Sequence, residues 1–346
     1  MSRLPETMKA FVTQESKMGA VIEIPVPTID DDEILVQIMA VAQNPTDWKY
    51  LRNVTNVGTI CGCDWSGYVV KIGKNVKSFA NGDHAAGFVQ GGTYTDRGAF
   101  AEFVKTPAGL AWQVPRETFS SEEAATMGCA FYTAVQALFH PTRLALVEPP
   151  AKVDKDEWIL VYGGSSSVGM FAIQLAKLAG YQVITTCSPH NFDLVKALGA
   201  DHVVNYREPA VVREIRDVTK NSLRKALDTI SELPSQEITV KAMGSGTGTG
   251  KVITLLPVKP EVQSLRDDVN LQGQEINHRG SIYPASPEDR RHMAQFLTKV
   301  PGMVSAGMIK PNPIKVWKGG LYGINDGLQS MMEGKASGEK IVYKVD

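Results

Sequence analysis

A short loop rich in glycine and serine, residues 163–169, places the strongest constraint on how this chain can fold. It follows an apolar run, Trp158–Tyr162, that predicts a strand, and it precedes a helical stretch that is expected to end before Gly180. Small residues at such a turn let the backbone approach a pyrophosphate, whose charge the N-terminus of the helix stabilises. Ser166 stands where the G-x-G-x-x-G pattern has its middle glycine, so a plain tight turn is the alternative interpretation.

Predicted strands and helices alternate after this loop. The strands are expected at 183–187, 202–205, 224–229 and 251–256, and the helices at 192–198, 208–219 and 235–243. Regular alternation of this kind predicts an α/β domain, a doubly wound parallel sheet with helices on both faces. A second glycine-rich run, 244–250, follows a helix and precedes a strand, which is the wrong order for a phosphate loop, so we interpret it as a turn.

The first 130 or so residues have a different character. Short apolar or alternating runs at 10–13, 21–26, 34–42, 66–72 and 100–104 are separated by Gly, Asn, Asp and Pro, which predicts a small, irregular β-barrel or sandwich. After residue 280 we expect helices at 287–300 and 325–334 and a closing strand at 341–345. A length of 346 residues is consistent with two domains.

Composition excludes several classes of function. Lys and Arg total 36 and Asp and Glu total 37, so the net charge of −1 provides no basic field for nucleic acid. Four cysteines are too few for a disulfide framework in a chain of this length. The sequence shows no signal peptide and no run of about 18 apolar residues, so we expect a cytoplasmic protein without a membrane span.

The end of the second predicted strand indicates which dinucleotide would bind. An NAD-preferring fold carries Asp or Glu there to bind the ribose 2′-hydroxyl, but this strand continues Cys187-Ser-Pro-His-Asn191 and has no carboxylate. Ser188, His190 and Asn191 offer donors instead, and Tyr206 and Arg207 at the end of the next strand could reach a 2′-phosphate. This pattern favours NADPH over NADH, and the alternative is that these residues only form a turn and a helix cap.

Several motifs along the whole chain carry a family resemblance. They include Asn44-Pro-Thr-Asp47, Gly62-x-Asp64-x-x-Gly67, Gly98-Ala-Phe-Ala-Glu-Phe103 and the 163–169 loop. With them the chain resembles the zinc-independent medium-chain dehydrogenases/reductases. The runs 186–194 and 220–224 make it similar, within that superfamily, to the trans-acting enoyl reductases of fungal highly reducing polyketide synthases, the lovastatin enoyl reductase type.

The resemblance implies a domain organisation and a set of site residues. A GroES-like catalytic and substrate domain would comprise 1–129 and 278–346, and a Rossmann NADPH-binding domain would comprise 130–277, with the active site in the cleft between them. The implied cofactor contacts are Thr46, Asp47, Trp48, Lys49, Ser166, Ser167, Val168, Gly169, Ser188, Pro189, His190, Asn191, Tyr206, Leu255, Leu256, Gly338 and Glu339. The implied lining of the acyl pocket is Ala134, Val135, Gln136, Ala137, Leu138, Phe139, His140, Pro141, Gly273, Gln274, Glu275, Ile276 and Asn277.

The chemistry that the resemblance implies is delivery of a hydride from NADPH to the β-carbon of an α,β-unsaturated thioester, followed by protonation of the α-carbon. Lys49 is the leading candidate for a charged group near the nicotinamide, either as a hydrogen-bond donor to the ribose or as the proton source. Asn44 is expected to position the carboxamide or the ribose, and Thr133 to hydrogen-bond cofactor or substrate. Asp47 and Asp64 are expected to fix loops rather than to act as acids.

A metal site is not expected. The zinc alcohol dehydrogenases of this superfamily carry a Gly-His-Glu motif where this chain has Cys61-Gly-Cys-Asp-Trp-Ser-Gly67. A C-x-C pair without a nearby His or a second pair is weak evidence for zinc. Without a Lewis acid to activate an alcohol, reduction of an already polarised alkene is the chemistry that we expect.

The expected partner is the acyl carrier protein domain of a highly reducing polyketide synthase, or of a synthase–peptide synthetase hybrid. We expect a monomer, because His278 and Arg279 place charge at the edge of the last Rossmann strand, around 272–277. Two alternatives share the fold and the cofactor. One is a stand-alone NADPH quinone or alkenal oxidoreductase, and the other is a non-catalytic NADPH-binding protein.

Overall fold

The computed structural model describes residues 4–53, 56–245, 248–273 and 286–345. The chain forms two compact units. The first unit comprises Met1–Tyr132, Ile282–Gly307 and Pro311–Asp346, and the second unit comprises Thr133–Ser281 and Met308–Lys310. The expected ranges did not include Met308–Lys310 in the second unit. The Gln174 side chain explains this grouping, because it accepts a hydrogen bond from the Lys310 N–H at 2.8 Å and donates one to the Lys310 carbonyl at 3.2 Å.

The second unit is built on a sheet of six parallel strands in the order β10-β9-β8-β11-β12-β13. This is the strand order of the doubly wound dinucleotide-binding folds, so the predicted α/β class is confirmed. The strands are short and largely buried, which is why the sequence reads them as nearly continuous apolar runs. Their bounds are β8 Trp158–Tyr162, β9 Gln182–Cys187, β10 His202–Asn205, β11 Lys225–Asp228, β12 Gly250–Thr254 and β13 Val269–Gly273.

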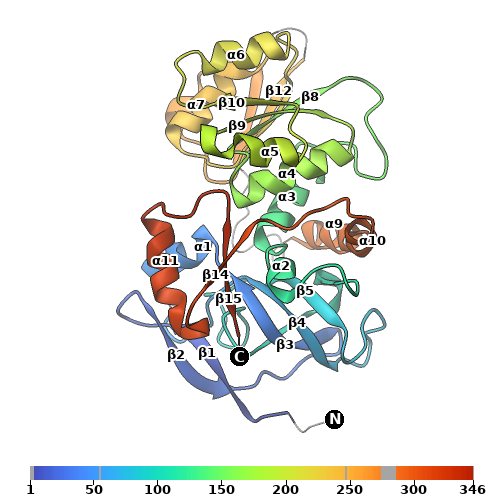
Figure 1. The fold of residues 1–346 in the computed structure, drawn as a ribbon, viewed down its shortest axis with the longest axis vertical. Coiled ribbons are helices and arrows are strands. Elements are labelled where there is room, and N and C mark those ends of the chain that lie inside the picture. Colours follow the sequence, from blue (N-terminus) through green and yellow to red (C-terminus); the bar gives the residue numbers. More distant parts are fainter. Residues whose placement is uncertain (1–3, 54–55, 246–247, 274–285, 346) are drawn as a thin grey trace. The chain divides into compact units, whose positions relative to one another are not determined.

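Helices cover both faces of this sheet. In Figure 1, α4 and α5 lie on one side of the strands and α6 and α7 on the other. The four helices are α4 Ser167–Leu178, α5 Phe192–Ala197, α6 Val211–Val218 and α7 Leu233–Ala242. The 3₁₀ turn η2 Pro189–Asn191 comes directly before α5, and the short α8 Pro260–Gln263 follows α7. Gly180 follows α4 with a φ of +86°, the left-handed conformation expected of a residue that ends a helix.

The first unit contains a seven-stranded sheet with the order β14-β15-β3-β4-β5-β7, in which β6 also pairs with β3. A separate antiparallel pair, β1 with β2, precedes it. The predicted β-rich character of this part is confirmed, although the strand expected at 100–104 begins only at Phe103. The bounds are β1 Thr7–Thr13, β2 Gly19–Pro25, β3 Glu33–Ala42, β4 Asp64–Ile72, β5 His84–Phe88, β6 Phe103–Pro107, β7 Ala111–Gln113, β14 Ile314–Trp317 and β15 Lys340–Lys344.

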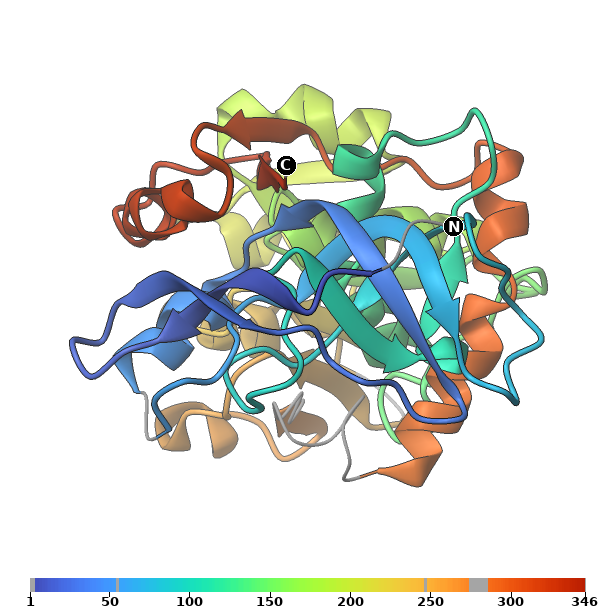
Figure 2. The same cartoon turned by 90° about the horizontal axis from the view of Figure 1, so that it is seen from below.

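Short helices complete the first unit. They are α1 Pro45–Arg52, α2 Ser121–Ala125, α9 Pro287–Leu297, α10 Val300–Ser305 and α11 Ile324–Met332, with 3₁₀ turns η1 Ala108–Leu110 and η3 Gly320–Gly323. Helix α3, Cys129–Phe139, runs across the boundary of the units in sequence. The pair α9 and α10 packs on the β7 side, where Figure 2 shows both in orange.

None of the helices in the described part of the chain has the length and apolar character that crossing a bilayer requires.

Candidate functional site

The loop between β8 and α4 forms a cradle made of backbone. A Cβ atom on Gly169 would meet the Gly163 carbonyl oxygen at 2.3 Å, and one on Gly164 would meet Thr185 Oγ1 at 2.1 Å. Ser166, in the place of the expected middle glycine, is the N-cap of α4 and accepts a hydrogen bond from the Gly169 N–H at 3.0 Å. Gly164 and Gly169 therefore have no room for a side chain, and this close packing fits the approach of a pyrophosphate to the start of α4.

An arginine and a serine meet at the carboxyl ends of β9 and β10. The Arg207 guanidinium donates to Ser188 Oγ at 2.8 Å and lies 4.6 Å from the centre of the Tyr206 ring. Pro189 and His190 are exposed beside Ser188, whereas Asn191 is buried at the start of α5. A guanidinium next to a hydroxyl at this strand end is suited to bind a phosphate group, because charge-assisted hydrogen bonds to Arg are strong and directional.

Asp228 fixes the next turn at the same edge of the sheet. Its side chain is fully buried at the end of β11 and accepts from the N–H groups of Ile230 and Ser231, both at 2.9 Å, and from Ser235 Oγ at 2.7 Å. Burial raises the pKa of Asp228 to about 6, although these three donors act against the shift. Ser231 Oγ in turn accepts from the Leu255 N–H at 2.7 Å, so the turn also holds the half-buried Leu255 and Leu256. Sequence analysis missed Asp228, although an aspartate followed by Ser231 and Ser235 is a local turn signal.

In the first unit, the predicted residues at 44–49 form the start of α1. The Asn44 N–H donates to Asp47 Oδ2 at 2.7 Å, which caps the helix. Lys49 and Trp48 are half-buried, and Lys49 Nζ lies 5.6 Å from the centre of the Trp48 ring. Thr46 is also half-buried, so Thr46, Trp48 and Lys49 all keep some exposed surface. Asp47, by contrast, is only 2% exposed, so its side chain lies in the interior, and its contact with a cofactor stays a prediction.

A buried polar cluster lies behind the start of α1. We call Asn44, Asp47, Asp64 and Lys340 the Lys340 cluster. Lys340 begins β15 and is 2% exposed, and its ammonium donates to Asn44 Oδ1 and pairs with Asp64 Oδ2 at 2.9 Å. Asp64 Oδ1 accepts from the Cys129 N–H. Sequence analysis missed Lys340, because a lysine at the start of a closing strand gives no sign that it will be buried.

Burial shifts the pKa values of Asp47 and of two nearby thiols. Burial raises the pKa of Asp47 to about 7, and the nearby Asp64 adds to the shift, while the Asn44 N–H and Lys340 oppose it. Burial also raises the pKa values of the Cys61 and Cys63 thiols, which Asp47 raises further, so both thiols stay protonated at neutral pH. In the residues that the structure describes, no three His, Cys, Asp or Glu side chains gather as a metal site would require, and zinc independence stays a prediction.

The residues expected around the acyl chain differ in how deeply they are buried, and some of them lie outside the described residues. Thr133 and residues 134–140 are buried on and just after α3, and Pro141 is exposed. Gln136 is 2% exposed, and its Nε2 has no hydrogen-bond partner among the described residues. Gly273 ends β13, whereas Gln274–Asn277 lie outside the described residues. Gly338 has a φ of +67°, and Glu339 pairs with Lys315 at 3.2 Å.

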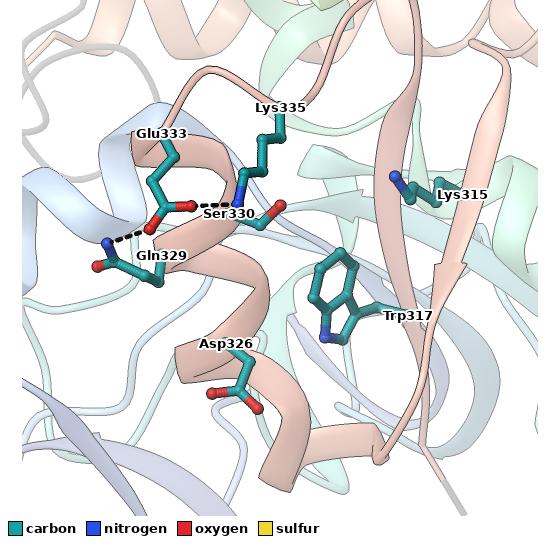
Figure 3. A pocket seen from close by; sticks show the side chains of 7 residues that line it. All are labelled: Lys315, Trp317, Asp326, Gln329, Ser330, Glu333 and Lys335. Carbon is teal, nitrogen blue, oxygen red and sulfur yellow. Dashed lines mark hydrogen bonds and ion pairs between the residues drawn. The ribbon is translucent and has the colours of Figure 1, made fainter.

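A surface hollow of about 490 Å³ lies between α11 and β14 (Figure 3). Glu333, at the end of α11, accepts from Gln329 at 2.8 Å and pairs with Lys335 at 2.6 Å, so its charge is compensated within the hollow. Sequence analysis predicted none of the residues that line it, and we assign no chemistry to it. The lining residues are Lys315, Trp317, Asp326, Gln329, Ser330, Glu333 and Lys335.

Comparison with known families matches both units. Residues 30–116 match the alcohol dehydrogenase GroES-like domain, and residues 167–299 match the zinc-binding dehydrogenase family. Among solved structures, the CurK enoyl reductase has the same fold, with a TM-score of 0.78 at 20% identity over 99% of this chain and 100% of that one.

Curated relatives match along nearly the whole length. The trans-enoyl reductase ACTTS2 of Alternaria alternata is 40% identical over 98% of this chain and 99% of its own length. The trans-enoyl reductase gkaC of Penicillium citrinum is 36% identical over 99% of both chains. With its glycine cradle, its parallel sheet and these relatives, the chain belongs to the medium-chain dehydrogenase/reductase superfamily and, within it, to the trans-enoyl reductases.

Proposed function

We propose that this enzyme reduces the α,β-double bond of an acyl thioester carried by the acyl carrier protein domain of a partner polyketide synthase, with NADPH as the reductant. The observation that carries the proposal is the near-full-length similarity to trans-enoyl reductases. When bound, NADPH supplies a hydride for the β-carbon, and a proton added at the α-carbon completes the saturated product. We expect this reaction to take place in the cytoplasm and the enzyme to act as a monomer.

The preference for the phosphorylated nucleotide is proposed to come from Arg207, Ser188 and Tyr206. The guanidinium already lies against Ser188 Oγ and over the Tyr206 ring, so little side-chain freedom would be lost when a phosphate binds. The five residues that end β9 and follow it, 187–191, include no carboxylate that would repel a phosphate. The backbone of the 163–169 loop and the start of α4 would hold the pyrophosphate.

The reacting end of the site is proposed to use Lys49, Asn44 and Thr133. Lys49 keeps part of its surface exposed at the side of α1, and it would either donate a hydrogen bond to the cofactor ribose or supply the proton. Asn44 would donate from its amide, and Thr133 would offer a hydroxyl. Their contribution would be to orient the reactants and to stabilise negative charge on the thioester oxygen as the enolate forms.

The proposal is tested with purified enzyme by following NADPH oxidation with crotonyl-pantetheine and, separately, with a simple quinone. We expect turnover of the thioester. Turnover of the quinone alone would favour a stand-alone quinone reductase, and tight NADPH binding without turnover of either compound would favour a non-catalytic protein. Either of these two results would overturn the proposed function.

Nucleotide preference is tested with Arg207→Ala. Loss of a charge-assisted contact should weaken NADPH binding about 10- to 100-fold and leave NADH binding unchanged. Arg213→Ala is the matched control, because Arg213 is an exposed arginine of the same unit on α6. Isothermal titration calorimetry measures both affinities. Equal binding of the two nucleotides by the wild-type protein would refute the assignment of NADPH.

A further inference from the structure

The Lys340 cluster contains an amide that has one hydrogen-bonded end and one unpaired end. Asn44 is 4% exposed, and its Oδ1 accepts from Lys340 Nζ. Its Nδ2 is buried and has no hydrogen-bond partner among the described residues. A buried N–H₂ group without an acceptor costs free energy, so such a group is expected to serve a bound molecule or to lie where one binds.

The chemistry of lysine fixes which end of the amide is unpaired. An ammonium group only donates hydrogen bonds, so the oxygen of Asn44 must face Lys340 and the N–H₂ must point elsewhere. This orientation does not depend on how the two ends of the amide were assigned. Lys340 Nζ forms an ion pair with Asp64 Oδ2 at 2.9 Å, and Asp64 Oδ1 accepts a hydrogen bond from the Cys129 N–H. These buried contacts fix the position of the ammonium and, through it, the orientation of the Asn44 amide.

We infer that Lys340 is a positioning residue, which locks the Asn44 amide so that its N–H₂ donates to an acceptor oxygen on the nicotinamide half of the bound cofactor. The inference rests on the proposed function for the identity of the cofactor. Lys340 acts through Asn44 and needs no contact with the ligand, because its ammonium donates to Asn44 Oδ1. Asp64 serves to balance the buried ammonium, since a buried charge without a partner is strongly unfavourable.

The test uses a variant that removes both charges together. Lys340→Met alone would leave Asp64 as an unpaired buried charge, so the informative variant is Asp64→Asn with Lys340→Met. Two ligands are titrated by calorimetry: NADPH and adenosine 2′,5′-bisphosphate, which lacks the nicotinamide half. We expect the double variant to bind NADPH about tenfold more weakly, as for one lost hydrogen bond, and adenosine 2′,5′-bisphosphate with unchanged affinity.

Asn44→Ala provides the second arm. It should cause a similar loss of NADPH affinity, and the triple variant that adds it to Asp64→Asn and Lys340→Met should bind no more weakly than Asn44→Ala alone. A merely structural role would weaken both ligands, or would make the losses additive. Either result overturns the inference, as does a double variant that binds NADPH like the wild type.

Failure of this inference can be told apart from failure of the proposed function. The binding measurements need no turnover. A wild-type enzyme that binds NADPH but reduces no enoyl thioester would overturn the proposed function alone. Wild-type affinity in the double variant, together with normal reduction of the thioester by the wild-type enzyme, would overturn the positioning role alone.

Discussion

Asp228 in the second unit and Asp47 in the first are both buried carboxylates, but different surroundings hold them. Asp228 has three donors within seven residues along the chain. Asp47 accepts from the Asn44 N–H, while its Oδ1 has no partner among the described residues, and its surroundings include Asp64 and Lys340 from distant segments. The second unit thus builds this part of its site from sequence neighbours, and the first unit joins residues almost 300 positions apart.

This difference has energetic consequences. A polar group satisfied by its own turn keeps its partners whenever the turn forms, so its surroundings are robust. A group whose partners come from β4 and β15 depends on the whole first unit, and removal of one member leaves another charge buried. We therefore expect that breaking the buried Lys340–Asp64 ion pair is more damaging than breaking a more exposed ion pair elsewhere.

The largest effect is expected from Lys340→Met. It leaves Asp64 buried without its cation, which should lower the free energy of unfolding by about 3–5 kcal/mol. Lys177→Met breaks an ion pair with Asp201 in the second unit whose side chains are 33% and 36% exposed, and should cost less than about 1 kcal/mol. Urea denaturation measures both. Similar losses in the two variants would contradict the comparison, and addition of Asp64→Asn should restore most of the stability lost in Lys340→Met.

The next effect concerns the pH dependence of stability. Both carboxylates have folded-state pKa values above their ordinary 3.8, so the folded protein favours their protonated forms. The two carboxyl groups therefore make their full stabilising contribution below about pH 4, and this contribution declines as the pH rises. The decline ends at about pH 7 for Asp47 and at about pH 6 for Asp228. The shifts correspond to about 4 and 3 kcal/mol.

Asparagine variants separate the two contributions. Relative to the wild type, Asp47→Asn should gain free energy of unfolding steadily from pH 4 to pH 7, whereas the gain of Asp228→Asn should level off near pH 6. Urea denaturation at a series of pH values measures this. A difference from the wild type that does not change between pH 4 and pH 7 would mean that these carboxyls are ionised throughout that range.

The smallest effect is expected at the glycine cradle. Gly169→Ala places a methyl group 2.3 Å from the Gly163 carbonyl oxygen. The substitution should lower the free energy of unfolding by about 1–3 kcal/mol and should also weaken NADPH binding. Gly302→Ala on α10 is the control in the first unit, because nothing lies within 4 Å of the added atom. There the helix should gain up to about 1 kcal/mol. Calorimetry and urea denaturation measure the two variants, and an unaltered NADPH affinity in Gly169→Ala would argue against the cradle as the pyrophosphate site.

Much of the second unit could be predicted from its sequence. Strands β8 and β10 lie at the predicted residues, because each contains a short apolar stretch next to residues that favour turns. The 163–169 loop was also recognisable, since its small residues satisfy a local backbone requirement. The first unit was less predictable. Helix α1 was missed because it is only eight residues long and depends on its cap, and β6 begins later than expected.

The amino-acid sequence by itself determined the two-part organisation, the parallel sheet and the turn that would hold a pyrophosphate, because local patterns of apolar runs, helix signals and small residues indicate them. Only the tertiary structure decided that Lys340 is buried against Asn44 and Asp64, and that Asp47 faces inward. Pairing between β15, β3 and β4 brings these segments together, and the protonation of a carboxyl or the orientation of an amide depends on neighbours that no local pattern specifies.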